Sequence, residues 1–226
     1  LSSEPLKRIS LELGGKSPSV VFADANLDDA IPSSVWSIYY SAGQSCEARS
    51  RVLVERSIYD DVVSGFAEAA SRLKVGDPLD SETQVGSLIS REHRDRVHGY
   101  VEAGREEGAD VVTGGEPTEG KGAFYPPTVL ARVDNSMRVA QEEIFGPVTS
   151  VIEVASIDEA IRVLNNTKYG LSSSAIGSRG GSRRAPSGST CRTPPFRGFR
   201  SAATRNQASA ASSGSRRSMR TSRRRA

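Results

Sequence analysis

The sequence contains very little cysteine or histidine, and this scarcity excludes several kinds of site. Only two of its 226 residues are cysteine and two are histidine. Cys46 and Cys191 lie 145 residues apart and provide no disulfide framework, and His93 and His98 lack the Cys/His spacing of a zinc site. We therefore predict no metal site and a reducing compartment, most simply the cytoplasm.

Long hydrophobic runs are also absent. No stretch reaches the roughly twenty apolar residues that a membrane-spanning helix needs. The opening residues "LSSEPLKRIS" include neither an initiator Met nor the charged-then-apolar run of a secretory signal. The sequence predicts no membrane partner, and it indicates a chain that is processed or, as we favour, an internal fragment.

Acidic residues are missing from one end of the chain. Residues 177–226 contain thirteen Arg but no Lys, Asp or Glu, so residues 1–176 carry seventeen basic against twenty-seven acidic residues. The net charge of +3 is the sum of the charges of these two unlike regions. Because 177–226 also lacks Leu, Ile and Val, it cannot bury enough apolar surface to offset the entropy of ordering. We predict a folded domain over 1–176 and a disordered Arg/Ser/Ala-rich tail over 177–226.

Within 1–176, strand signals alternate with helix signals. Short apolar, β-branched runs predict strands, and capped stretches with an apolar face predict helices. Strands are expected within 17–24, 51–57, 109–115 and 146–154, an extended piece over 124–133, and helices within 27–42, 58–73, 91–108 and 156–167. Strands separated by helices predict an α/β domain with a mostly parallel sheet.

Cys46 follows a Gly-Gln-Ser turn in the stretch "SAGQSC", and the residue could be a buried thiol, a metal ligand or a nucleophile. A cysteine attacks as its thiolate, and a small-residue turn could present it at a cluster of backbone N–H groups. Free cysteine is among the most buried residue types. Taken alone, Cys46 therefore favours a structural thiol.

Glu12 in "LELGGKSP" changes this balance. It ends an apolar stretch and precedes two glycines that permit a tight turn or the close approach of a ligand. Taken alone, Glu12 could be a surface carboxylate. A carboxylate near a thiol also suits the activation of a water that hydrolyses a thioester.

Five motifs occur in a fixed order: "LELGGKSP", "GQSC", "FYPPTVL" at 124–130, "EEIFGPV" at 142–148 and "NNTKYGLSS" at 165–173. Together they resemble the aldehyde dehydrogenase superfamily over residues 1 to about 176. The resemblance implies a three-layer α/β catalytic domain, with the last edge of a cofactor domain at 1–15. It also implies NAD or NADP as the cofactor, an aldehyde substrate and a homo-oligomeric intact protein.

The resemblance assigns a role to each matched residue. Cys46 would attack the aldehyde to give a thiohemiacetal, hydride transfer to the nicotinamide would leave a thioester, and Glu12 would activate the hydrolytic water. Glu143 would bind the hydroxyls of the nicotinamide ribose, Phe145 would flank the nicotinamide, and Leu13 would offer its backbone carbonyl to the nicotinamide amide. Without the family, Glu143 would be a solvated charge and Phe145 a core residue.

Four residues near these motifs need separate comment. Glu47 and Arg49 depart from the family, which commonly has a small residue after the cysteine and often a glycine two further on. We expect the site to survive because both side chains can face away from it. His93 and His98 lie in a polar helix with no recognisable partner and are predicted to be surface residues.

The basic tail has two explanations. With freely chosen codons for residues 203–220, reading one nucleotide earlier can give "GYPEPGIGRELGLEAIDE", which resembles the C-terminal segment of the family and favours a frameshift near 174–180. The rival is a genuine tail that binds phosphate backbones non-specifically. No specific nucleic-acid partner is predicted.

The sequence thus predicts an NAD(P)-dependent aldehyde dehydrogenase by family, with little or no activity in this chain alone. The cofactor turn, the oxyanion-hole asparagine and the lysine that meets the adenosine ribose all belong to family segments that it does not contain. Two alternatives belong to other classes. One is a cofactor-independent thiol hydrolase that uses Cys46 and Glu12, and the other is a non-enzymatic, basic-tailed binding protein.

Overall fold

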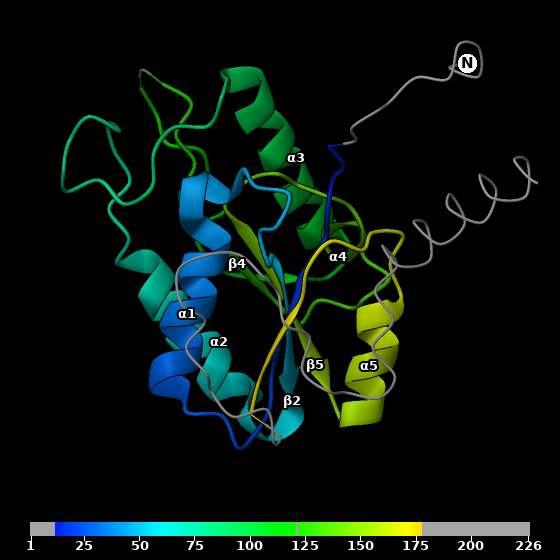
Figure 1. Ribbon diagram of the computed structural model, residues 1–226. Coiled ribbons are helices and arrows are strands. Elements are labelled where there is room, and N and C mark those ends of the chain that lie inside the picture. Colours follow the sequence, from blue (N-terminus) through cyan, green and yellow to red (C-terminus); the bar gives the residue numbers. More distant parts are fainter. Residues whose placement is uncertain (1–11, 121, 178–226) are drawn as a thin grey trace, which may run out of the picture.

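Six strands form a single sheet in the order β3-β4-β5-β2-β1-β6 (Figure 1). The computed structural model describes residues 12–120 and 122–177. The strands are β1 (Pro18–Val21), β2 (Arg51–Glu55), β3 (Asp110–Thr113), β4 (Thr128–Ala131), β5 (Val148–Val154) and β6 (Ser174–Ile176). The helices are α1 (Leu27–Tyr39), α2 (Tyr59–Ser71), α3 (Arg91–Glu106), α4 (Arg138–Gln141) and α5 (Ile157–Asn165).

The sheet is mostly parallel, as the alternating strand and helix signals predict. The pairs β1–β2, β2–β5, β4–β5 and β1–β6 are parallel, and only β3 runs antiparallel to its neighbour β4. Two short elements, α4 and β6, were not predicted. Strand β6 is three residues long and is defined by its pairing with β1 across the sheet, which local sequence preferences do not reveal.

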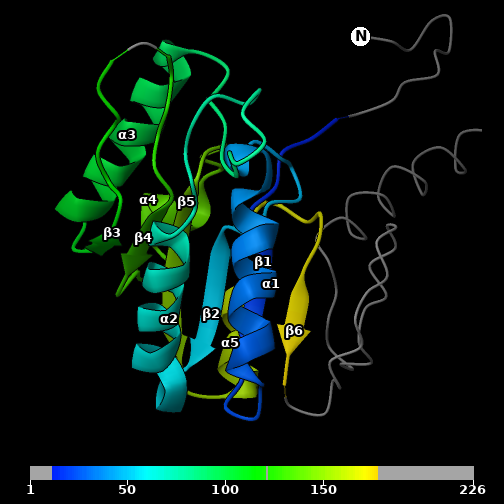
Figure 2. The same cartoon turned by 90° about the vertical axis from the view of Figure 1, so that its left-hand side faces the viewer.

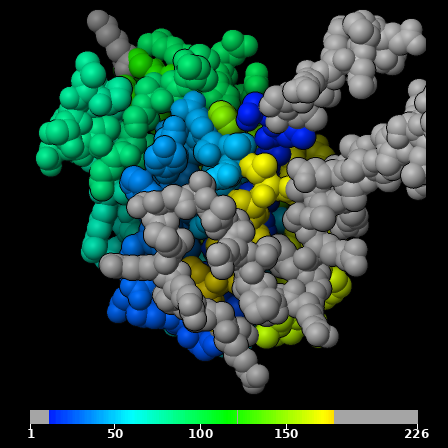
Figure 3. All heavy atoms as spheres, in the orientation of Figure 1, coloured from blue at the N-terminus to red at the C-terminus, as the bar shows by residue number. Residues whose placement is uncertain are grey.

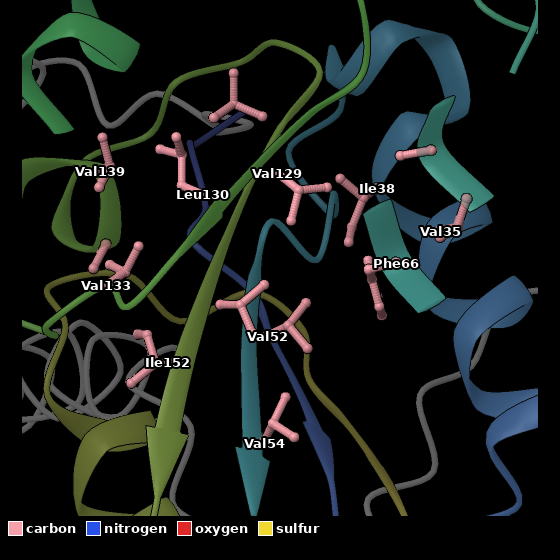
Figure 4. Close-up of a cluster of buried hydrophobic side chains, with 14 of the residues drawn as sticks. Val35, Ile38, Val52, Val54, Phe66, Val129, Leu130, Val133, Val139 and Ile152 are labelled. Carbon is pink, nitrogen blue, oxygen red and sulfur yellow. The ribbon is translucent and has the colours of Figure 1, made fainter. Parts of the chain in front are cut away.

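Helices cover both faces of the sheet, which confirms a three-layer arrangement. Helices α1 and α2 pack on one face and α5 lies on the other (Figures 1 and 2). Buried side chains fill both interfaces, with Ile38 and Phe66 on the α1/α2 side and Val133 and Ile152 on the other (Figure 4). Strand β2 is buried from Arg51 through Val54, as expected of a parallel strand covered on both faces.

Side-chain caps fix where three helices begin. Asn26 caps α1 by accepting from the Asp28 N–H at 3.2 Å, and Ser90 and Ser156 cap α3 and α5 in the same way. These caps satisfy backbone donors that have no partner inside the helix. Pro32 lies within α1 without ending it. The caps therefore fix where the loops before these three helices end.

The five motifs lie in loops or strands at one edge of the sheet. The Gly-Gly loop precedes β1, the cysteine turn precedes β2, residues 142–147 precede β5, and residues 170–173 precede β6. Because these four strands are parallel, their amino ends meet at the upper edge in Figure 1. Figure 3 shows the start of the described chain, in dark blue, beside the yellow segment at this edge. We call this edge the amino edge.

Candidate active site

Two adjacent glycines bring three motifs into contact. The Gly15 N–H donates to Oε1 of Glu143 at 3.1 Å. A Cβ atom added to Gly15 would lie 2.3 Å from the Cys46 carbonyl oxygen, and one added to Gly14 would lie 1.9 Å from Oε2 of Glu143. Any side chain at either position would therefore push the cysteine turn or the carboxylate away.

The turn before Cys46 has an unusual backbone. Ser41, Ala42 and Gly43 have φ values of 52°, 53° and 72°, three left-handed residues in succession. The left-handed conformation is uncommon for residues other than glycine and often marks a functional site. Position 43 also requires glycine, because a Cβ there would lie 2.1 Å from the Gly146 carbonyl oxygen. The cysteine turn is thus packed against the 142–147 turn.

Neighbouring side chains hold Cys46 at this place. Gln44 donates through Nε2 to the Ser41 carbonyl at 3.2 Å, and its Oε1 accepts from the Ile89 N–H at 2.9 Å. The backbone carbonyl of Ser45 accepts from the Ala48 N–H at 3.1 Å, which closes a turn around Cys46. Cys46 is a free, half-buried thiol and is not part of the hydrophobic core.

Glu12 and Leu13 lie just before the two glycines and are both exposed. Two residues, Leu13 and Gly14, separate Glu12 from Gly15, a span of at most about 10 Å. Because Gly15 lies against the Cys46 carbonyl, this short span limits how far Glu12 can be from the cysteine turn. The side chain of Glu47 is exposed, and within the described ranges no ion pair joins Glu47 to Arg49.

Glu143 and Phe145 occupy the turn that faces the glycines. Glu143 is half-buried and accepts from Gly15, so it is not a solvated charge. Phe145 is 39% exposed and has a left-handed φ of 57°, so it is not a core residue. Without the family, Glu143 was interpreted as a solvated charge and Phe145 as a core residue. Both interpretations are wrong, because the turn before β5 keeps both side chains at the amino edge.

The prediction that His93 and His98 are surface residues without partners is wrong. Both are half-buried. His93 bonds through Nε2 to the Phe145 carbonyl at 2.7 Å, and His98 bonds through Nδ1 to the Tyr125 hydroxyl at 3.1 Å. The partners lie 52 and 27 residues away, on elements that sequence periodicity does not bring together.

Two buried cations lie behind the amino edge and were not identified from the sequence. Lys16 is 1% exposed, and among the described residues its Nζ has no hydrogen-bond partner. Burial lowers the pKa of Lys16 to about 7; Arg51 acts in the same direction, whereas Glu143 and Glu142 oppose it. The signal available in the sequence was a lysine placed between a glycine pair and a buried strand.

Arg51 is the second buried cation and ties β2 to α5. Its guanidinium donates to the Leu164 carbonyl at 3.0 Å, the Val163 carbonyl at 3.3 Å and Oδ1 of Asn135 at 3.0 Å. Burial lowers the pKa of Arg51 to about 10. A cation at the carbonyl end of a helix is favourable, which explains an arginine at the start of an apolar strand.

In the described part of the chain, no group of three or more His, Cys, Asp or Glu side chains is arranged to hold a metal ion. None of the helices in residues 12–120 and 122–177 is both long and apolar enough to cross a membrane.

The fold and the site define a three-layer α/β domain that gathers a thiol, two acidic residues and an exposed aromatic ring at one sheet edge. Comparison with known sequences identifies the class. The profile described as "Aldehyde dehydrogenase family" matches residues 1–184, and the chain belongs to the aldehyde dehydrogenase family.

Individual relatives agree with this membership. The chain is 48% identical over 175 residues to 5-carboxymethyl-2-hydroxymuconate semialdehyde dehydrogenase of Escherichia coli, covering 74% of this chain and 37% of that protein. It is 46% identical over 167 residues to aldehyde dehydrogenase 1A1 of Oryctolagus cuniculus, covering 74% and 34%.

Solved structures of the family share the fold. An NAD+ complex of aldehyde dehydrogenase from Bacillus cereus superposes with a TM-score of 0.76 at 42% identity, covering 78% of this chain and 36% of that one. Betaine aldehyde dehydrogenase from Staphylococcus aureus gives a TM-score of 0.75 at 36% identity, with coverage of 79% and 36%. The chain spans about a third of the length of each of these relatives.

Proposed function

We propose that this chain is the catalytic segment of an enzyme that oxidises an aldehyde to a carboxylic acid with NAD+ or NADP+. The contact of Gly15 with both the Cys46 carbonyl and the Glu143 carboxylate carries the proposal, because it joins the three motifs that the chemistry requires. The Bacillus cereus relative, described as an NAD+ complex, supports the choice of cofactor. We also infer a cytoplasmic homo-oligomer for the intact protein.

Cys46 acts as the nucleophile. Its thiolate adds to the aldehyde carbon, a C–S bond forms, and the carbonyl electron pair moves to the oxygen to give a thiohemiacetal oxyanion. A backbone N–H aimed at that oxygen stabilises the charge as it develops. Within the described residues no protein acceptor takes the Cys46 N–H, which leaves this donor free for the role.

Glu143 and Phe145 fit the nicotinamide end of the cofactor. A carboxylate has about four lone-pair sites, and the Gly15 N–H uses one, so Glu143 can still accept from ribose hydroxyls. The exposed ring of Phe145 offers a flat apolar surface to the nicotinamide, and Leu13 a backbone carbonyl to its amide. A bound NAD(P)+ would supply the acceptor for the hydride that leaves the carbon attached to Cys46, and a thioester would remain on the sulfur.

Glu12 acts as the general base that releases the product. Its carboxylate takes a proton from a water molecule, the water oxygen adds to the thioester carbon, and the C–S bond breaks to give the acid and the Cys46 thiolate. The exposure of Glu12 supports this role, because a hydrolytic water must reach it. Apart from Gly177, the tail at 177–226 lies outside the described residues, and its origin by frameshift stays a prediction that the nucleotide sequence tests.

The two cysteines allow a matched test of the nucleophile. Formation of reduced nicotinamide from aldehyde and NAD(P)+ is followed in the protein that carries this segment. Cys46→Ala should lower the rate by at least about a thousandfold, as expected when a covalent nucleophile is removed, whereas Cys191→Ala should leave it unchanged. Equal rates in wild type and Cys46→Ala would exclude Cys46 as the nucleophile.

An activated ester separates the proposed function from the hydrolase alternative. A burst of product without NAD(P)+, absent from Cys46→Ala, together with no reduction of NAD(P)+ by any aldehyde, would favour a cofactor-independent thiol hydrolase. Reduced nicotinamide that depends on Cys46 would favour the dehydrogenase.

A further inference from the structure

One face of α3 contacts three parts of the 142–147 turn. His93, Val97 and Tyr100 are spaced four and three residues apart and so share a helix face. His93 bonds to the Phe145 carbonyl at 2.7 Å, and Tyr100 donates its hydroxyl to Oε2 of Glu142 at 2.8 Å. Between them, Val97 packs so closely that a Cβ on Gly146 would lie 2.6 Å from its Cγ2.

The His93 contact fixes the residue with the least favourable backbone in this turn. Phe145 is left-handed at φ 57°, a conformation that a bulky residue keeps only when its surroundings impose it. A carbonyl oxygen only accepts, so the His93 Nε2 carries the donated hydrogen. The imidazole also meets the Phe145 ring edge-on, with ring centroids 6.3 Å apart. His93 thus constrains both the backbone and the ring of Phe145.

Both sides of this turn lead to the candidate site. On one side, Glu143 accepts from the Gly15 N–H. On the other side, the Gly146 carbonyl meets Gly43, three residues before Cys46. A turn that relaxes at Phe145 would therefore disturb the carboxylate and the cysteine turn together.

We propose that His93 is a positioning residue whose Nε2–H, donated to the Phe145 carbonyl, holds Phe145 and Glu143 in the orientation that receives the nicotinamide end of the cofactor. The cofactor part of this role rests on the proposed function. The hydrogen bond and its effect on the turn do not, so the two can be tested separately.

Hydrogen exchange measured by mass spectrometry on the full chain tests the effect on the turn. In His93→Leu the amides of residues 143–146 should exchange about tenfold faster than in wild type, because local opening is no longer opposed by the bond. His93→Gln should keep the wild-type rate, since its side-chain amide can donate to the same carbonyl. His98→Leu is the matched control on the same helix and should leave these amides unchanged.

The outcomes separate the role of His93 from the proposed function. Unchanged exchange of residues 143–146 in His93→Leu, or equal acceleration in His93→Gln, would overturn the positioning role. In the intact enzyme, His93→Leu should raise KM for NAD(P)+ about tenfold and His93→Gln should restore it. An intact wild type that binds no NAD(P)+ would contradict the proposed function, and the exchange comparison would still decide the role of His93 in the turn.

Discussion

The two ends of the parallel sheet differ sharply in how they are built. At the amino edge, Lys16 and Arg51 are buried cations, and the turns that carry Cys46 and Phe145 contain left-handed residues. At the carboxyl ends of the strands, one residue, Arg132 after β4, is left-handed, and the other contacts are those of an ordinary surface. The Ala23 N–H donates to Glu55 at 2.8 Å, and exposed side chains pair Arg56 with Glu153.

This difference indicates which end carries the function. Many open α/β sheets bind ligands at the carboxyl ends of their strands. Here the motifs, the two buried cations and three of the four left-handed non-glycine residues of the described chain lie at the opposite edge, whereas the fourth, Arg132, follows β4. A buried charge without a hydrogen-bond partner, such as Lys16, and a left-handed backbone both reduce stability, and such features typically gather where a site requires them. Substitutions at the amino edge should therefore have large effects, and those at the other end small ones.

The largest effect is expected from Gly43→Ala. Residue 43 is left-handed, a conformation that strains alanine, and the added methyl group would clash with the Gly146 carbonyl. Because that carbonyl is part of the backbone, moving it away would cost considerable free energy. We expect a loss of about 4 kcal/mol in the free energy of unfolding, measured by urea denaturation.

Gly99→Ala provides the matched control. Gly99 lies within α3, and a Cβ there would meet nothing within 4 Å. This substitution should be neutral or stabilise by about 0.5 to 1 kcal/mol, because alanine is the better helix former. Similar losses in both variants would show that the amino edge is not specially constrained.

The next effect, of opposite sign, is expected from Lys16→Met. At pH 7 this variant should be more stable than wild type by about 3 kcal/mol, because it removes a buried charge that has no hydrogen-bond partner in the described residues. Urea unfolding at a series of pH values measures the difference.

The pH dependence has a defined sign. The pKa of Lys16 is about 7 in the folded chain against 10.5 for an ordinary lysine, so the unfolded state binds more protons between these values. Wild-type stability should rise with pH across this window, and the advantage of Lys16→Met should shrink. If the difference in stability between Lys16→Met and wild type is constant from pH 7 to 10.5, the pKa of Lys16 is not lowered by burial.

The smallest effect is expected at the carboxyl end. Arg56→Ala removes an ion pair whose two side chains are both exposed, and such pairs contribute little. The midpoint of urea unfolding and the rate of Cys46 alkylation should both match those of wild type. A clear loss of either would show that the carboxyl end also supports the site.

The sequence was sufficient to predict the elements whose signals are local. The apolar run at Pro18–Val21 and the capped helix at Ile157–Asn165 form where they were expected. Cys46, Glu12, Glu143 and Phe145 were found because the motifs match a family, and the structure brings their loops to one edge. Their chemical roles stay predictions.

The features that the sequence did not reveal all depend on distant partners. His93 was assigned to the surface because its partner, the Phe145 carbonyl, is backbone and lies on another element. Lys16 was overlooked because its burial requires the surrounding sheet and the 142–147 turn. The left-handed residues Ser41 and Ala42 lead into Gly43, which lies against the Gly146 carbonyl, and no local propensity indicates this contact. All of the predicted disordered tail except Gly177 lies outside the described residues.

A covalent adduct on Cys46 tests the central claim most directly. The protein that carries this segment is mixed with an aldehyde and NAD(P)+, and the peptides are analysed by mass spectrometry. In Glu12→Gln, hydrolysis of the thioester should stall, and the acyl group should accumulate on the Cys46 peptide but not on the Cys191 peptide. Turnover of the aldehyde with no acyl group on Cys46 in Glu12→Gln would contradict the account.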